Sequence, residues 1–193
     1  MQSIAALVLS LAACAAAAPR SVDNSGPFQI YAYGAGIGGL SLFSSGGDAF
    51  FGDHTKMNDT NAAPVIFTPT SDSSTVWTGA PNTTDLGSNS TLPSWSNVTF
   101  SIPSASSSDH SVGFLSSNSS SSSDRQTSGF IFYGTFIFVE GGSTGMESLW
   151  YATPSSVDGV YNLRWNETGD ATENKIALTL KKTPPSSKTS KTI

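Results

Sequence analysis

The sequence predicts an all-β fold, either a two-sheet antiparallel β-sandwich or a jelly roll. Short runs rich in Val, Ile, Phe, Tyr, Trp and Thr recur along the chain, and each is bounded by Gly, Pro, Asn, Asp or Ser. No segment after residue 18 keeps a helical period. With 193 residues, 37% of them hydrophobic and 12% charged, the chain can bury the core of one domain.

Eleven strands are expected from these runs, enough for two stacked sheets. Two runs show the alternation of a half-buried strand. Tyr161, Leu163 and Trp165 alternate with polar side chains, and residues 174–182 repeat this pattern. The expected strands span residues 28–33, 40–43, 48–52, 64–68, 75–78, 95–102, 111–115, 129–140, 147–153, 159–166 and 174–182.

The run 130–139 differs from the others because it is apolar at both alternating sets of positions. This pattern is typical of a strand covered on both faces. We therefore expect a central strand here, in which Phe132→Ala or Phe136→Ala destabilises the fold by about 3–5 kcal/mol.

The two ends of the chain differ from the region between them. Residues 1–18 resemble a signal peptide, too short to span a bilayer, so we expect a secreted protein. Cleavage would remove Cys14, the one cysteine, and with it any disulfide or thiolate chemistry. We expect residues 19–27 to form a short lead, 28–182 the single domain and 183–193 a disordered basic tail. This tail lacks a terminal hydrophobic segment, so we expect no membrane anchor.

The charge distribution argues against nucleic acid as a partner. Residues 21–180 contain all 14 acidic side chains but only the basic residues Lys56, Arg125, Arg164 and Lys175. Such an acidic body repels phosphate groups. We expect a monomer that binds no nucleic acid.

Motifs for cofactors and metals are weak. Residues 34–39 match the glycine pattern of dinucleotide sites, but a strand-like run follows where a helix is required, so we predict a tight turn and no cofactor. His54 and His110 each follow an aspartate, at Asp53 and Asp109. Because these pairs lack further closely spaced ligands, we expect solvent-exposed loops and no metal site.

One pair of carboxylates is a weak candidate for catalysis. Glu140 and Glu147 flank a glycine-rich connection between two expected strands, so a hairpin would bring them to one rim. Paired acids about 5–9.5 Å apart cleave glycosidic bonds. Their place beside a flexible turn favours ordinary surface charges over a catalytic pair.

Aromatic side chains are the candidate ligand-binding residues, because flat rings stack against the apolar faces of sugars. Trp150 and Tyr151 are adjacent in an expected strand and point to opposite sides, so we expect one of them to be exposed or in a groove. Trp77 and Trp95 lie among small polar residues. Core packing is the simpler interpretation of each ring.

Six acceptor sequences for N-glycosylation occur, where chance alone gives about three. They are absent from the most apolar runs, as expected for positions on exposed loops. The acceptors are Asn58, Asn82, Asn89, Asn97, Asn118 and Asn166.

Five runs together resemble a family of small secreted proteins of filamentous ascomycete fungi. These runs are 28–34, 38–40, 47–53, 148–154 and 158–166, and the resemblance extends over nearly the whole mature chain. The family has no established activity and no assigned catalytic residues, so the resemblance implies a fungal, extracellular and glycosylated setting without assigning a role to any residue.

These observations predict a secreted glycoprotein of the fungal cell wall or matrix. We expect a non-catalytic protein that binds cell-wall polysaccharide weakly. Two alternatives remain open: a glycan-cleaving hydrolase that uses Glu140 and Glu147, and a secreted effector or elicitor that acts on a host or competitor.

Overall fold

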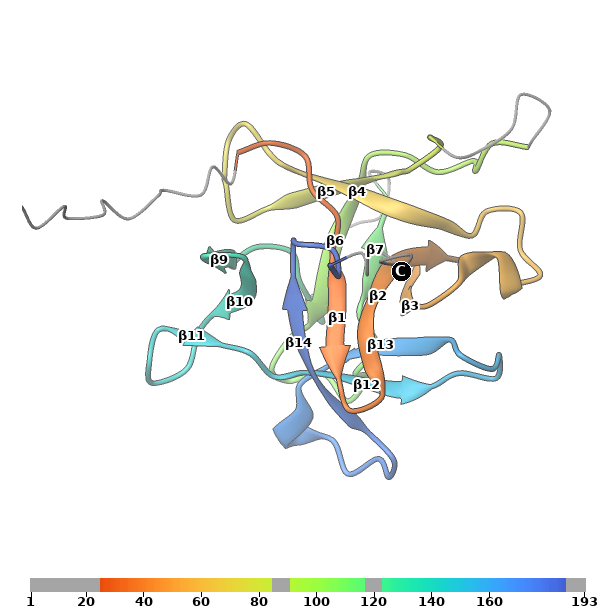
Figure 1. The fold of residues 1–193 in the computed structure, drawn as a ribbon. Helices are drawn as coiled ribbons and strands as arrows, with labels where there is room; N and C mark the ends of the chain where they lie inside the picture. The colour runs from red at the N-terminus through yellow and green to blue at the C-terminus, as the bar shows by residue number, and fades with distance from the viewer. Residues whose placement is uncertain (1–24, 85–90, 117–122, 187–193) are drawn as a thin grey trace, which may run out of the picture.

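A computed structural model describes residues 25–84, 91–116 and 123–186 (Figure 1). The all-β prediction is confirmed, since 14 strands and two 3₁₀ turns make up the regular structure of these residues. The strands are β1 (Tyr31–Gly34), β2 (Ile37–Ser45), β3 (Asp48–Phe51), β4 (Ala63–Pro69), β5 (Trp77–Pro81), β6 (Val98–Pro103), β7 (Gly113–Leu115), β8 (Arg125–Gln126), β9 (Phe130–Tyr133), β10 (Phe136–Glu140), β11 (Met146–Glu147), β12 (Trp150–Pro154), β13 (Tyr161–Trp165) and β14 (Ile176–Lys181). The 3₁₀ turns are η1 (His54–Lys56) and η2 (Glu167–Gly169).

Ten strands close into an antiparallel barrel in the order β1-β2-β4-β5-β6-β7-β3-β13-β12-β14, because β14 pairs back with β1. The barrel does not separate clearly into the two stacked sheets of a sandwich or jelly roll. The reason lies in β2, whose nine residues pair with β1 through the first half and with β3 and β4 through the second. One long strand therefore joins what would otherwise be two layers.

The run 130–139 is not a central strand, and that prediction is wrong. The chain reverses at Gly134, which has a φ of 62°, so the run folds into the hairpin of β9 and β10. Tyr133 and Phe136 flank this turn and are 67% and 37% exposed. The prediction took the run as one strand although Gly134, a turn-forming residue, interrupts it.

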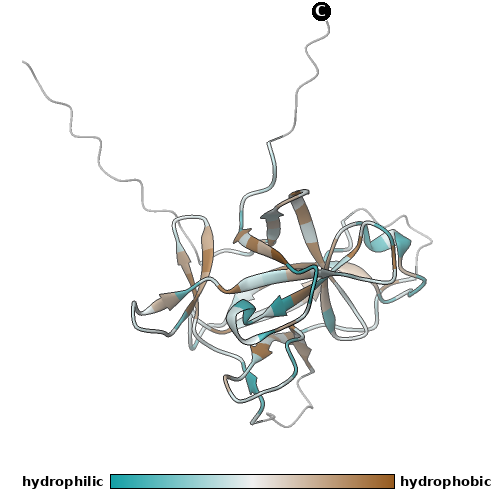
Figure 2. Ribbon diagram, turned by 90° about the horizontal axis from the view of Figure 1, so that it is seen from below, coloured by the Kyte–Doolittle hydropathy of each residue, from teal (hydrophilic) through white to brown (hydrophobic). Residues whose placement is uncertain are grey.

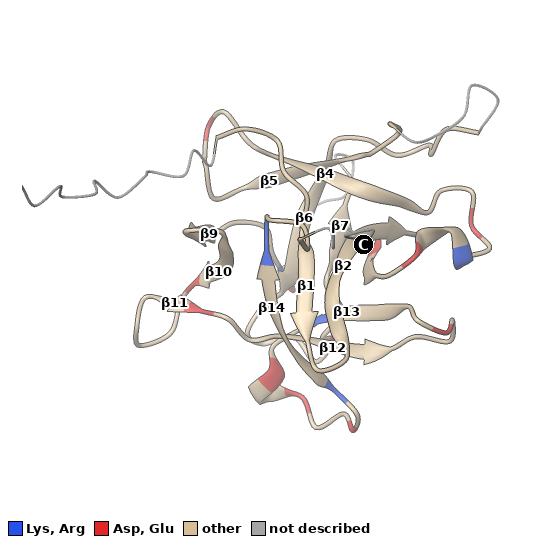
Figure 3. Cartoon of the chain, in the orientation of Figure 1, with Lys and Arg blue, Asp and Glu red and all other residues tan. Residues whose placement is uncertain are grey.

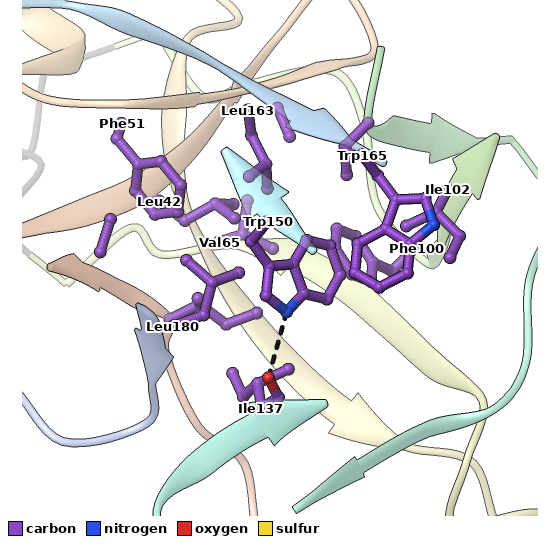
Figure 4. Packing of buried hydrophobic residues seen from close by; sticks show 14 of the residues in the cluster. Leu42, Phe51, Val65, Phe100, Ile102, Ile137, Trp150, Leu163, Trp165 and Leu180 are labelled. Carbon is purple, nitrogen blue, oxygen red and sulfur yellow. Dashed lines mark hydrogen bonds between the residues drawn. The ribbon is translucent and has the colours of Figure 1, made fainter. Parts of the chain in front are cut away.

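The core contains many aromatic side chains from strands on different sides of the barrel. Figure 2 shows that hydrophobic residues are spread over many of the strands. Trp77, Phe67 and Phe100 are fully buried and contact one another through their rings. Trp150 packs against Trp165 at a centroid distance of 4.5 Å (Figure 4). Burying rings of this size supplies much of the apolar area that stabilises the fold.

The alternation predicted for the last two strands is confirmed. Leu163 and Trp165 of β13 are buried, as are Leu178 and Leu180 of β14. Tyr161 at the start of β13 is half-buried and packs against the same core.

The glycine-rich run after β1 forms a tight turn, as predicted. Gly36 has a φ of 74° between β1 and β2, and the next residues continue as a strand. A helix that could hold a pyrophosphate is therefore missing at this position.

The two ends of the chain are described only in part. The expected signal peptide lies outside the described residues. At the other end, Thr183 accepts a hydrogen bond at its carbonyl from the Tyr33 hydroxyl at 3.1 Å, and Pro185 packs against Gly39. The described chain thus remains in contact with the barrel beyond the expected domain boundary at residue 182. None of the described helices has the length and apolarity needed to cross a membrane.

Candidate functional site

Three of the four candidate aromatic residues belong to the core. Trp77, Trp150 and Tyr151 have no exposed surface, so none of them can offer a ring to a sugar. The two indole N–H groups are satisfied by main-chain carbonyls at 3.1 Å, from Ser74 for Trp77 and from Ile137 for Trp150. The expectation that Trp150 or Tyr151 is exposed is therefore wrong.

The loop after β13 explains the burial of Tyr151. The Tyr151 hydroxyl donates a hydrogen bond to Asp170, and Lys175 Nζ lies 5.7 Å from the centre of the tyrosine ring. Burial and the Asp170 bond raise the pKa of Tyr151, while the same bond lowers the pKa of Asp170. A sequence pattern of strand residues could not show that a later loop covers this face.

Trp95 is the remaining candidate, and it is half-buried rather than buried. It precedes β6 and lines a surface hollow of about 260 Å³ together with Phe114, whose ring stacks on it at 6.4 Å. The backbone turn at Gly46 and Gly47, between β2 and β3, forms another wall. The full lining is Ser44, Gly46, Gly47, Asn61, Ser94, Trp95, Val98, Phe114 and Ser116.

Hydrogen bonds fix the orientation of the Trp95 ring at this hollow. Its Nε1 donates to the carbonyl of Asn61 at 2.8 Å, and Asn61 Oδ1 accepts from the Ser94 amide and hydroxyl at 2.8 and 2.9 Å. The carboxylate of Asp59 accepts hydrogen bonds from the Ser45 hydroxyl and from the main-chain N–H of Asn61, and these bonds lower the pKa of Asp59. The ring is thus held in place before any ligand arrives, which reduces the entropy lost on binding.

Glu140 and Glu147 lie in a larger groove of about 590 Å³, which His110 and Trp165 also line. The predicted hairpin is confirmed, because Val139 pairs with Glu147 across β10 and β11. Directly paired residues point to the same face, whereas Glu140 is one position further along its strand. The register therefore directs the two carboxylates to opposite sides of the hairpin, which disfavours a shared glycosidic bond.

His110 has a defined tautomer in this groove. Its Nδ1 lies 3.1 Å from the carbonyl oxygen of Trp165, which can only accept, so Nδ1 carries the proton in the neutral ring. His54, the other histidine, is half-buried in η1. In the part of the chain that the structure describes, no group of three His, Cys, Asp or Glu side chains could hold a metal ion.

Arg125 and Arg164 form a polar network beside His110. Each guanidinium lies 3.9 Å from a carboxylate oxygen of Asp109, and Arg125 also donates to the buried Ser101. Arg164 donates to the Ser111 hydroxyl at 2.6 Å. These bonds join the loop before β7 to β6 and β13, and indicate a structural role for the two arginines.

The glycosylation candidates occupy different surroundings. Asn58 and Asn97 are exposed, whereas Asn82 and Asn166 are half-buried. In both half-buried residues Oδ1 accepts a hydrogen bond from the threonine two positions on, at 2.7 Å for Asn82 and 2.6 Å for Asn166. Since a glycan is attached through Nδ2, these bonds are compatible with modification. Asn89 and Asn118 lie outside the described residues.

Sequence reasoning missed a second group of exposed rings. Tyr133 and Phe136 stand at the turn of β9 and β10, and Lys181 of β14 lies 4.7 Å from the centre of the Phe136 ring. The signal that could have found them is Gly134, a turn residue inside an otherwise apolar run.

Comparison with known proteins finds no relative of this chain. No protein-family model, no curated protein and no solved structure matches it.

Proposed function

We propose that this chain is a secreted, glycosylated, non-catalytic protein of the fungal cell wall or matrix that binds polysaccharide weakly. The site is the hollow at Trp95. The observation that carries the proposal is that Trp95 alone among the four candidate rings keeps exposed surface, and that it does so beside polar groups in a hollow.

The chemistry of the hollow suits a sugar ring. The indole presents a flat apolar surface to the C–H face of a pyranose. Asn61 Oδ1 is held by Ser94, which turns the amide nitrogen away from Ser94 as a donor for a sugar hydroxyl. At about 260 Å³ the hollow is smaller than most small-molecule sites, so it fits one unit of a chain.

Weak affinity follows from so small a contact. One stacked ring and a few hydrogen bonds correspond to a dissociation constant near 1 mM, or about 4 kcal/mol. Binding at the wall would then depend on many neighbouring units of the same polysaccharide, since linked sites raise the effective concentration.

Affinity electrophoresis in gels containing soluble chitin, β-1,3-glucan or cellulose derivatives tests this function. We expect at least one polysaccharide to retard the protein, and Trp95→Ala to reduce the retardation. Leu92→Ala is the matched control, because Leu92 is 65% exposed and is not part of the hollow. Absence of retardation in every gel, or equal retardation of the Trp95→Ala protein, overturns the proposal.

Glycan cleavage is a second candidate, favoured by one observation: Glu140 and Glu147 line the same groove with Trp165. A hydrolase would release reducing sugar from a polysaccharide, and both Glu140→Gln and Glu147→Gln would abolish the release. The opposite directions of the two carboxylates make this the weaker candidate.

A further inference from the structure

Four outward side chains form a continuous row across β1, β14, β10 and β9. Tyr31 pairs with Lys181, Lys181 pairs with Phe136, and Phe136 pairs with Tyr133. Directly paired residues share one face of a sheet. Figure 1 shows β14 between β1 and the hairpin of β9 and β10. We call these four residues the aromatic row.

The row faces outward because the alternate positions are inside. Ala32, Leu180 and Ile137, which each adjoin a member of the row, are all buried. Phe136 is 37% exposed and Tyr133 is 67% exposed, so two of the three rings offer large accessible surfaces.

Lys181 holds the middle of the row in place. Its Nζ lies 4.9 Å from the ring centre of Tyr33 and 4.7 Å from that of Phe136. These cation–π contacts fix the ammonium group at the surface between the two rings. The row therefore presents ring surfaces with the ammonium group of Lys181 among them.

We propose that the aromatic row binds the flat face of a β-1,4-linked polysaccharide whose chain runs across the strands. Neighbouring strands lie about 4.8 Å apart, so Tyr31 and Phe136, two strands apart, are separated by about 10 Å. A β-1,4-linked chain presents the same face every second sugar, at a similar repeat. The rings stack on sugar faces at this repeat, and Lys181 donates to a hydroxyl between them.

The charge of the row disfavours a second copy of this chain as the occupant. A two-fold contact between two rows would bring Lys181 close to its own counterpart, and like charges in contact are destabilising. Figure 3 shows basic residues at the end of β14, while acidic residues lie on the surrounding loops and on β10 and β11. A neutral ligand with many hydroxyl groups avoids the repulsion between the two lysines.

This surface is separate from the Trp95 hollow, and the inference does not depend on binding there. The hollow involves the β2–β3 turn, β6 and β7, whereas the row lies on β1, β14, β10 and β9. The row suits an extended polysaccharide surface, while the hollow suits a single sugar unit.

A depletion assay on insoluble chitin and cellulose tests the row. We expect the native protein to be retained on at least one of them. Tyr133→Ala and the double variant Tyr133→Ala/Phe136→Ala should weaken retention, the double variant about tenfold. Tyr133 is exposed enough for its single variant to fold normally, which circular dichroism and thermal unfolding would verify.

Leu92→Ala is the matched control and should be retained as well as the native protein, because Leu92 is exposed and belongs to neither proposed surface. Retention of the double variant at the native level, or no retention of the native protein on either solid, overturns the inference. Sedimentation supplies a further contradictory outcome: a native dimer that the double variant converts to a monomer would assign the row to self-association. Failure of the Trp95 hollow would appear as equal retardation of the native and Trp95→Ala proteins in the gels with soluble polysaccharide, whatever the double variant does on the solids.

Discussion

The indole of Trp150 in β12 donates a buried hydrogen bond to the main-chain carbonyl of Ile137 in β10, at 3.1 Å (Figure 4). Both residues are essentially inaccessible to solvent. β10 meets the barrel through a single register pair with β14, between Phe136 and Lys181. Main-chain hydrogen bonds from Phe130 to Thr75 and from Lys182 to Thr135 also hold the hairpin, and the Trp150 bond adds an inward attachment to them.

Trp150→Phe should destabilise the fold and loosen the hairpin in particular. The variant leaves the carbonyl of Ile137 buried without its donor, which costs about 1–3 kcal/mol. Urea unfolding measures the loss of stability, and amide hydrogen exchange should accelerate more in β9 and β10 than in β4 and β5. Equal acceleration in all four strands would show that the bond has no special role in holding the hairpin.

Truncation of the two phenylalanines Phe100 and Phe136 should have very different effects. Phe100 is fully buried among rings, so Phe100→Ala should lower the free energy of unfolding by about 3–5 kcal/mol. Phe136 is 37% exposed, and Phe136→Ala should cost less than about 2 kcal/mol. Chemical denaturation of both variants checks this order. Similar losses of stability would support the central strand predicted from the sequence and contradict the hairpin.

Gly113 and Gly38 form a matched pair for close packing. A Cβ at Gly113 would lie 2.5 Å from the carbonyl oxygen of Gly47, whereas one at Gly38 would meet nothing within 4 Å. Gly113→Ala should force β7 away from β3 and destabilise the fold by about 1–3 kcal/mol. Gly38→Ala should be close to neutral. Thermal unfolding compares the two, and a neutral Gly113→Ala would contradict the β3–β7 contact.

The Tyr151–Asp170 bond should make stability depend on pH at both extremes. Because Asp170 has a lowered pKa in the folded state, its contribution is complete above the unfolded value of about 3.9 and is lost as the pH falls through the folded value. Tyr151 has a raised pKa, so its contribution is present below about pH 10 and is lost as the pH rises through the folded value.

Urea unfolding of the native protein and of Asp170→Asn, from about pH 2 to about pH 7, measures how much stability is lost on the acid side. The stability difference between the two proteins should be constant near neutrality and shrink toward the acid end. Tyr151→Phe should reproduce the loss, and the double variant should add little to it. A stability difference that grows as the pH falls would contradict a lowered pKa of Asp170 in the folded state.

The strands could be predicted from the sequence because their signal is local. Ile176, Leu178 and Leu180 alternate with polar or small residues, and the structure places all three against the core. The closed barrel could not be predicted, since it depends on β14 pairing with β1 and on β2 pairing with three other strands. No local pattern shows how far one strand bends.

The candidate site was predicted less well for the same reason. Trp77 and Trp95 both lie among Ser, Thr and Gly, yet one is buried and the other lines a hollow. Their difference arises from partners distant in sequence: Phe28 and Phe132 pack on Trp77, whereas Asn61 and Phe114 position Trp95. Composition around a ring does not determine its exposure.

A nuclear magnetic resonance titration with soluble oligosaccharides of chitin, β-1,3-glucan and cellulose tests polysaccharide binding most directly. Each tryptophan gives its own indole N–H signal, so the four rings can be followed separately. The account predicts that one oligosaccharide series shifts the Trp95 signal in a saturable way near 1 mM and leaves the buried Trp77 and Trp150 signals in place. An unmoved Trp95 signal in all three titrations would contradict it.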